Sequence, residues 1–180
     1  MHASICDIIA DVVQNAIEAK ASQVTLEICT GSETLHVRVT DNGKGMDATT
    51  MAKAMDPFTS EAGKHDHRKV GLGLPFLRQT VDAVNGKLEI QSEPGQGTTV
   101  SFYLDPHHVD LPPFGDLPGT VLGLMTFGNT YNLTIKRKTH SDGYMISRQE
   151  LCDTLGDLDS ALNLTLARDF LTEQERALTH

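Results

Sequence analysis

Two neighbouring segments of the chain alternate apolar and polar residues, and this alternation constrains the fold more than any other feature of the sequence. Residues 24–29 read Val-Thr-Leu-Glu-Ile-Cys, and residues 35–40 read Leu-His-Val-Arg-Val-Thr. Because successive side chains of a strand point to opposite faces, each segment predicts a strand with one apolar face. Gly31 and Ser32 predict the turn that joins the two strands.

Other segments show the spacing of helices or of further strands. Apolar residues recur at helical spacing from residue 4 to residue 20, and Asp47 stands where it would cap a short helix. The remaining prediction, in chain order, is a helix over 47–55, a mobile polar loop over 59–70, a helix that opens at Gly71 and ends at Gly86, and strands around 88–90 and over 98–104.

Prolines mark a division of the chain. Positions 106, 112, 113 and 118 are proline, which predicts a linker over 106–119 between a domain of residues 1–105 and a C-terminal appendage of residues 120–180. In the appendage, Val121–Phe127 and Tyr131–Arg137 predict a β-hairpin that turns at Gly128 and Asn129.

Leucines recur at three- and four-residue steps near the C-terminus, after Ser147, which has capping-box spacing to Glu150. This stripe either packs on the rest of the chain, pairs two subunits into a homodimer, or holds a partner. The stripe consists of Leu151, Leu155, Leu158, Leu162 and Leu166.

Charge and composition limit the function classes. The 180 residues carry a formal net charge of −9, which disfavours coating nucleic acid, because such binding needs a basic face. Anionic membrane surfaces would repel the chain, and no apolar run is long enough to span a bilayer. The first residues do not read as a signal peptide, and the cysteines show no metal or disulfide spacing. We therefore expect a cytoplasmic protein with neither a nucleic-acid nor a membrane partner.

The first predicted helix carries a polar stripe of Asp11, Asn15 and Glu18 beside its apolar face. One interpretation is a solvated acidic face. The other is that the stripe faces a ligand, in which case the Asn15 amide oxygen suits Mg²⁺ and Asp11 lies near a terminal phosphate.

Asp41 has the same parity as Leu35, Val37 and Val39, so it points toward the apolar side of its strand. A buried carboxylate needs hydrogen-bond donors, and the amino group of adenine is a suitable one. Thr98 has the same parity in its own strand and would reach Asp41 or the base. The alternatives are an ordinary Asp-Asn-Gly turn and a threonine that is simply a good strand residue.

Gly71 and Gly73 stand before a helix, where free backbone amides favour anions and glycine lets a phosphate approach. The segment is not a Walker loop, because no Gly-Lys-Ser/Thr follows it.

These motifs together resemble those of the ATPase superfamily that includes histidine kinases, DNA gyrase, heat-shock chaperones and MutL. The resemblance covers residues 4–104 and comes closest to sensor histidine kinases. It rests on an N box at 11–19, a first glycine box at 41–46, an F box at 56–59, a second glycine box at 71–74 and a glycine–threonine motif at 95–98.

The resemblance implies the Bergerat fold, an α+β two-layer sandwich with a mixed sheet and helices on one face. It also implies ATP and Mg²⁺ as ligands, with Asn15 on the metal, Asp41 on adenine assisted by Thr98, and Asp11 as the catalytic base. The adenine base would be enclosed by Gly43, Gly45 and Met46, and a lid over the nucleotide would be anchored by Phe58. The phosphate site would be lined by Gly71, Leu72, Gly73 and Leu74.

Some residues depart from the family pattern. Asp11 replaces the glutamate of the ATP hydrolases, and Glu18 stands where kinases often have lysine. Only a few residues precede the first helix, where sensor kinases carry a hairpin with the phosphoacceptor histidine. Three functions stay open: a kinase that phosphorylates a partner protein in trans, an ATP-dependent interaction switch without transfer, and a slow ATP hydrolase of the gyrase or MutL kind.

Overall fold

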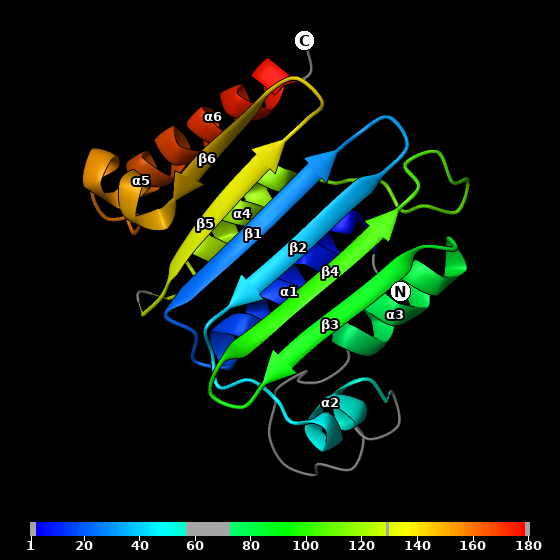
Figure 1. The fold of residues 1–180 in the computed structure, drawn as a ribbon. Coiled ribbons are helices and arrows are strands. Elements are labelled where there is room, and N and C mark those ends of the chain that lie inside the picture. The colour runs from blue at the N-terminus through cyan, green and yellow to red at the C-terminus, as the bar shows by residue number, and fades with distance from the viewer. Residues whose placement is uncertain (1–2, 57–72, 129, 179–180) are drawn as a thin grey trace.

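A computed structural model describes residues 3–56, 73–128 and 130–178 of the chain (Figure 1). In chain order its elements are α1 (Ile5–Glu18), β1 (Gln23–Thr30), β2 (Leu35–Asp41), α2 (Ala48–Ala54), α3 (Gly73–Ala83), β3 (Lys87–Glu93), β4 (Gly97–Leu104), α4 (Leu117–Met125), β5 (Asn132–Lys138), β6 (Gly143–Ser147), α5 (Arg148–Leu155) and α6 (Ala161–Leu178).

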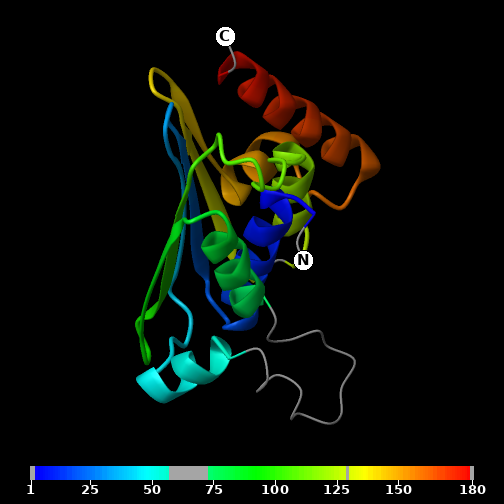
Figure 2. The same ribbon diagram turned by 90° about the vertical axis from the view of Figure 1, so that its right-hand side faces the viewer.

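The strands form one mixed sheet in the order β3-β4-β2-β1-β5-β6. The β1–β5 pair is parallel and the other pairs are antiparallel. Seen edge-on in Figure 2, the sheet has α1, α3, α4, α5 and α6 on the same face, while α2 lies beyond one end of the strands. The expected α+β sandwich is therefore confirmed. Among the described residues, no helix is long and apolar enough to cross a membrane.

The core lies between the sheet and the helices on its covered face, and α1 with the first two strands contributes a large part of it. The Ser4 side chain accepts a hydrogen bond from the Asp7 amide and so caps α1. The helix buries the predicted apolar stripe of Ile5, Ile8, Ile9, Val12, Val13 and Ala16. The inward residues of β1 and β2 are buried as the alternation predicts, and they are Val24, Leu26, Ile28, Leu35, Val37 and Val39.

The predicted elements between residues 47 and 104 are also confirmed where they are described. Asp47 caps α2 by accepting a hydrogen bond from the Thr50 amide at 2.7 Å. Helix α3 begins at Gly73, and the chain reverses after it through Asn85, which has a φ of 52°, and Gly86. The predicted loop over 59–70 lies outside the described residues.

The hairpin predicted around Gly128 and Asn129 is wrong, because residues 121–125 belong to helix α4. Asp116 caps this helix by accepting a hydrogen bond from the Gly119 amide at 3.0 Å, and Pro118 occupies its first turn. The prolines that predicted a linker therefore include one that starts a helix. The hairpin of this region is formed by β5 and β6 instead, one strand later.

The leucine stripe does not follow one helix. A capping box at Ser147 begins α5 as predicted, but the chain leaves the helix at Gly156, which has a φ of 86°. Leu151 and Leu158 are buried, whereas Leu162 and Leu166 are 68% and 44% exposed. A homodimer through the C-terminal helix stays a prediction.

Residues beyond 105 are attached to the rest of the fold at α1 and at β1. The Ile5 and Cys6 amides donate to the carbonyls of Pro113 and Phe114, at 2.9 Å each, and so satisfy free donors at the start of α1. Strand β5 continues the sheet beside β1. The division of the chain at residues 105 and 119 stays a proposal.

A buried arginine links β5 to α6 and predicts a measurable contribution to stability. Arg137 is 9% exposed and donates to Thr30 Oγ1 at 2.8 Å and to Glu175 Oε2 at 3.3 Å. We expect Arg137→Ala to lower the free energy of unfolding by about 2–3 kcal/mol, because the variant leaves the partly buried Glu175 carboxylate without its cationic partner. Urea unfolding followed by circular dichroism measures this.

Arg168→Ala is the matched control. Arg168 pairs with Asp116 at 2.7 Å, but both side chains are more than half exposed, so we expect a loss of about 0–1 kcal/mol. Equal losses in the two variants would contradict a structural role for the buried arginine.

Candidate functional site

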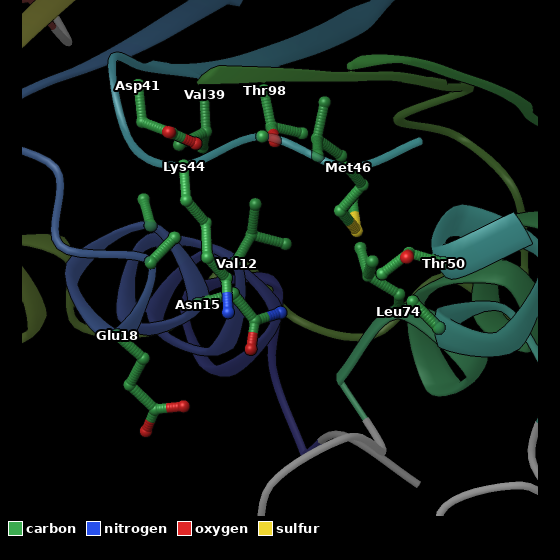
Figure 3. A pocket seen from close by; sticks show the side chains of 15 residues that line it. Val12, Asn15, Glu18, Val39, Asp41, Lys44, Met46, Thr50, Leu74 and Thr98 are labelled. Carbon is green, nitrogen blue, oxygen red and sulfur yellow. The ribbon is translucent and has the colours of Figure 1, made fainter. Parts of the chain in front are cut away.

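A cavity of about 510 Å³ opens at the end of the sheet where β2 stops and β4 starts (Figure 3). Its volume is that of a small-molecule site, and most of its wall is apolar. We call it the sheet-end cavity. It is lined by Val12, Asn15, Ala16, Glu18, Ala19, Val39, Asp41, Lys44, Gly45, Met46, Thr50, Ala54, Leu74, Thr98 and Val100.

Asp41 lies at one end of the sheet-end cavity and points inward, as its parity predicts. It is the last residue of β2 and pairs across the strands with Thr98 of β4. Its Oδ1 accepts a hydrogen bond from the Gly43 amide at 2.7 Å. Burial raises the pKa of Asp41 above its usual value, while hydrogen bonds from the backbone of Gly43 and Thr98 act in the opposite direction. The chain thus holds a carboxylate in a partly buried wall and supports it with backbone donors.

The loop of residues 42–46, which we call the glycine loop, is pressed between α1 and the turn from β3 to β4. The Lys44 amide donates to the Ala19 carbonyl at 3.0 Å, and the Lys44 carbonyl accepts from the Gly95 amide at 2.7 Å. Gly45 has a φ of +64°, and a Cβ there would lie 1.9 Å from the Glu93 carbonyl oxygen. This position therefore requires glycine, and the close fit places Met46 in the cavity wall.

Thr98 also lies in the cavity wall, next to Asp41. Its hydroxyl is 2.9 Å from the Ser92 hydroxyl of the neighbouring strand β3. Asp41 and Thr98, predicted to face the same side from two separate strands, are thus brought together by the register of β2 and β4.

The other end of the cavity lies between α1 and the start of α3. Asn15 and Leu74 are both in its wall. A Cβ on Gly73 would lie 3.3 Å from Asp11 Cβ and 3.4 Å from Asn15 Nδ2, so the first turn of α3 sits directly against the polar stripe of α1. The structure therefore brings together Asp11, Asn15 and Gly73. Phe58, Gly71 and Leu72 lie outside the described residues.

The site also contains residues that the sequence motifs did not indicate. In Figure 3 the Lys44 side chain extends from the glycine loop into the cavity toward Asn15. Lys44 lies between Gly43 and Gly45, which were predicted to line the site, and this position in the sequence could have indicated that Lys44 belongs to the site. Thr50 and Ala54 come from α2, whose position over the cavity has no local sequence signal.

At this end of the cavity a cation would be held jointly with a ligand, because Asn15 supplies a single amide oxygen. Within the described part of the chain, no group of three or more His, Cys, Asp or Glu side chains could hold a metal ion. A single amide such as that of Asn15 fits Mg²⁺, which keeps several waters and takes phosphate oxygens as further ligands.

Comparisons with known proteins found a matching family model and related proteins. Residues 2–108 match the family model described as histidine kinase-, DNA gyrase B-, and HSP90-like ATPase. Sensor histidine kinase YxdK of Bacillus subtilis is 30% identical over 98 residues, which are 52% of this chain and 30% of that protein. The non-motile and phage-resistance protein of Caulobacter vibrioides is 36% identical over 78 residues, 42% of this chain and 9% of its own length. Sensor histidine kinase RcsC of Escherichia coli is 27% identical over 94 residues, 51% of this chain and 10% of its own length. The chain thus spans less than a third of these relatives.

Proposed function

The chain belongs to the histidine kinase-, DNA gyrase B-, and HSP90-like ATPase family, and we propose that it binds Mg-ATP in the sheet-end cavity and transfers the terminal phosphoryl group to a partner protein. One observation carries the proposal. An inward carboxylate stands at one end of the cavity, and the start of a helix meets a polar stripe at the other. A nucleotide has the matching polarity, with a hydrogen-bond donor on its base and negative charge on its phosphates.

The base end of the proposed site is formed by Asp41, Thr98 and the glycine loop. The second oxygen of Asp41 accepts a hydrogen bond from the adenine amino group, while Oδ1 stays with the Gly43 amide. Val39, Val100 and Met46 provide apolar wall for the flat ring. The absence of side chains at Gly43 and Gly45 lets the ring approach the backbone.

The phosphate end is formed by α1, α3 and Lys44. The first amides of α3 have no partner within the helix and favour an anion, as does its dipole. Asn15 is the proposed Mg²⁺ ligand, and the ion would neutralise charge on the phosphates when bound. The Lys44 ammonium group adds positive charge at this end, because its side chain extends toward Asn15.

Asp11 is the proposed base of the transfer. It lies one helical turn before Asn15, and its side chain faces Gly73 at the start of α3. In the proposed step a partner side chain attacks the terminal phosphorus, the bond to the bridging oxygen breaks, ADP leaves, and Asp11 takes the proton of the acceptor. The relatives named as sensor histidine kinases support phosphoryl transfer as the reaction class.

A second candidate is an ATP-dependent switch without transfer, and the exposure of α2 favours it. Helix α2 has no buried residue, yet Thr50 and Ala54 line the cavity. A ligand that fills the cavity therefore covers part of α2 and changes the surface that this helix presents.

Incubation of the chain and a candidate partner with γ-labelled ATP tests the proposal. We expect label on the partner, and a decrease in labelling rate of about 100-fold in Asp11→Asn, since a general base typically contributes 10²–10⁴-fold. Asp7→Asn is the matched control, because it changes an exposed carboxylate of the same helix that is not part of the cavity lining.

The fate of the phosphate separates the alternatives. Free phosphate without labelled protein would indicate a hydrolase. Tight ATP binding with neither product would indicate the switch and would contradict phosphoryl transfer.

A further inference from the structure

Three polar residues form a row across the end of the sheet, on the face that the helices cover. Ser92 of β3 is the cross-strand partner of Thr98 in β4, and Thr98 is in turn the partner of Asp41 in β2. Thr98 and Asp41 line the sheet-end cavity, and Ser92 lies one strand further toward the sheet edge. Ser92 is therefore placed to act on the cavity through Thr98.

The Ser92 hydroxyl uses all of its hydrogen-bonding capacity. It accepts from the Met46 amide at 2.8 Å, donates to the Gly97 carbonyl at 3.1 Å, and lies 2.9 Å from Thr98 Oγ1. A hydroxyl has one proton, and a carbonyl can only accept. Since the Ser92 proton is directed to Gly97, the hydrogen bond between the two hydroxyls has Thr98 as its donor.

This proton arrangement makes the base end of the cavity an acceptor. With its proton directed to Ser92, Thr98 presents lone pairs to the cavity. The backbone donors beside it, on Gly43 and Thr98, are directed at the Asp41 carboxylate. The groups left for a ligand are then the remaining lone pairs of the Asp41 carboxylate and those of the Thr98 hydroxyl, and both require a donor.

We propose that Ser92 is a positioning residue that fixes Thr98 as a hydrogen-bond acceptor. The site then selects adenine, which has an amino group at C6, over a purine with a keto group at that position. The inference rests on the proposed nucleotide-binding function. Through the Met46 amide, the same hydroxyl also holds the end of the glycine loop. Without Ser92 the Thr98 hydroxyl rotates freely and donates to a keto oxygen, so the discrimination falls.

Binding of ATP and of inosine triphosphate to the full 180-residue chain, measured by calorimetry, tests this. Inosine triphosphate has the same phosphates but a keto group in place of the amino group. For wild type we expect a preference for ATP of about 100-fold, and Ser92→Ala should lower that ratio by about tenfold, the effect of one hydrogen bond. Ser101→Ala is the matched control, because it removes a neighbouring hydroxyl that binds Arg38 on the opposite face of the sheet.

A double-mutant cycle with Thr98→Val shows whether Ser92 acts through Thr98. On the Thr98→Val background, Ser92→Ala should leave the ratio of the affinities for ATP and inosine triphosphate unchanged, since there is no Thr98 hydroxyl left to orient. A loss of overall affinity with an unchanged ratio would mean that Ser92 only supports the fold, and would overturn the inference. If Ser92→Ala does not fold, Ser92→Cys gives the same readout, because a thiol is a weak donor and acceptor.

The experiment separates failure of this inference from failure of the proposed function. A wild-type chain that binds neither nucleotide contradicts both. A wild-type chain that binds ATP selectively, together with a Ser92→Ala variant of the same selectivity, contradicts only the role of Ser92.

Discussion

Asp41→Asn is expected to weaken ATP binding by about 100-fold or more while the chain keeps its fold. In the wild type, Oδ1 accepts from the Gly43 amide, and both carboxylate oxygens are acceptors, so the second one can accept from the ligand. An asparagine has one oxygen and one amino group, so keeping the bond to Gly43 turns the amino group toward the amino group of adenine. Two donors then face each other in a partly buried wall. Calorimetric titration with Mg-ATP measures the loss.

The pH dependence of binding gives the same residue a second signature. Burial raises the pKa of Asp41. Because Oδ1 accepts from the Gly43 amide, a proton on this carboxyl group would sit on the second oxygen and turn it from an acceptor into a donor. ATP affinity should therefore fall as the pH is lowered through that raised pKa, at a higher pH than for an exposed aspartate. In Asp41→Asn this part of the pH dependence should disappear.

Asp47→Asn is the matched control for the charge change. Asp47 is exposed and caps α2, and asparagine caps a helix equally well. We expect ATP affinity within about twofold of wild type. If Asp41→Asn also binds ATP within that range, the inward carboxylate does not contact the base, and the base end of the site has been assigned wrongly.

Gly45→Ala is expected to lower the free energy of unfolding by about 3–5 kcal/mol, because the left-handed conformation costs about 1–2 kcal/mol for a residue with a Cβ and the overlap adds strain. The new Cβ would lie 1.9 Å from the Glu93 carbonyl oxygen and 3.2 Å from that of Gly97. To relieve this overlap the glycine loop must leave the turn from β3 to β4. Met46 then leaves the cavity wall, so ATP binding should be lost as well.

Gly95→Ala separates the overlap from the backbone conformation. Gly95 has a φ of +77°, but no atom lies within 4 Å of a Cβ built there. This variant should lose only about 1–2 kcal/mol and should still bind ATP. Denaturant unfolding of both variants gives the comparison, and losses of the same size would show that the contact with Glu93 does not determine the position of the glycine loop.

The sequence predicted the described part of the first 104 residues well because the signals there are local. The alternation of apolar and polar residues predicts which face of β1 and β2 is buried. The positions of Asp41 and Thr98 within this alternation predict that both side chains point to the buried face, and the two residues are partners on neighbouring strands. A capping residue, Asp47, marked the start of α2. The alternation pattern predicts the face on which a side chain lies, but it does not predict the residue that is its partner on the next strand.

The features that the sequence analysis missed depend on contacts between distant segments. The parallel pairing of β5 with β1 joins residues more than a hundred positions apart, and no turn signal accompanies such a pair. The apolar run at 121–125 fits either a strand or a buried helix, and the capping residue Asp116 is the local feature that favours the helix α4. Ser92 gained its role from the register that sets it beside Thr98.

The segment beyond the family match supports the helix that carries Asp11 and Asn15. The match ends at residue 108, yet the carbonyls of Pro113 and Phe114 bind the first amides of α1, and β5 covers the edge of β1. The C-terminal elements therefore stabilise the framework of the site as well as extending the sheet.

A crystal structure of the chain with Mg²⁺ and a non-hydrolysable ATP analogue tests the central claim most directly. The account predicts the adenine amino group within hydrogen-bonding distance of Asp41, the metal on the Asn15 amide oxygen, and the phosphates at the start of α3. An analogue bound elsewhere on the chain, or a sheet-end cavity that stays empty at saturating analogue, would contradict it.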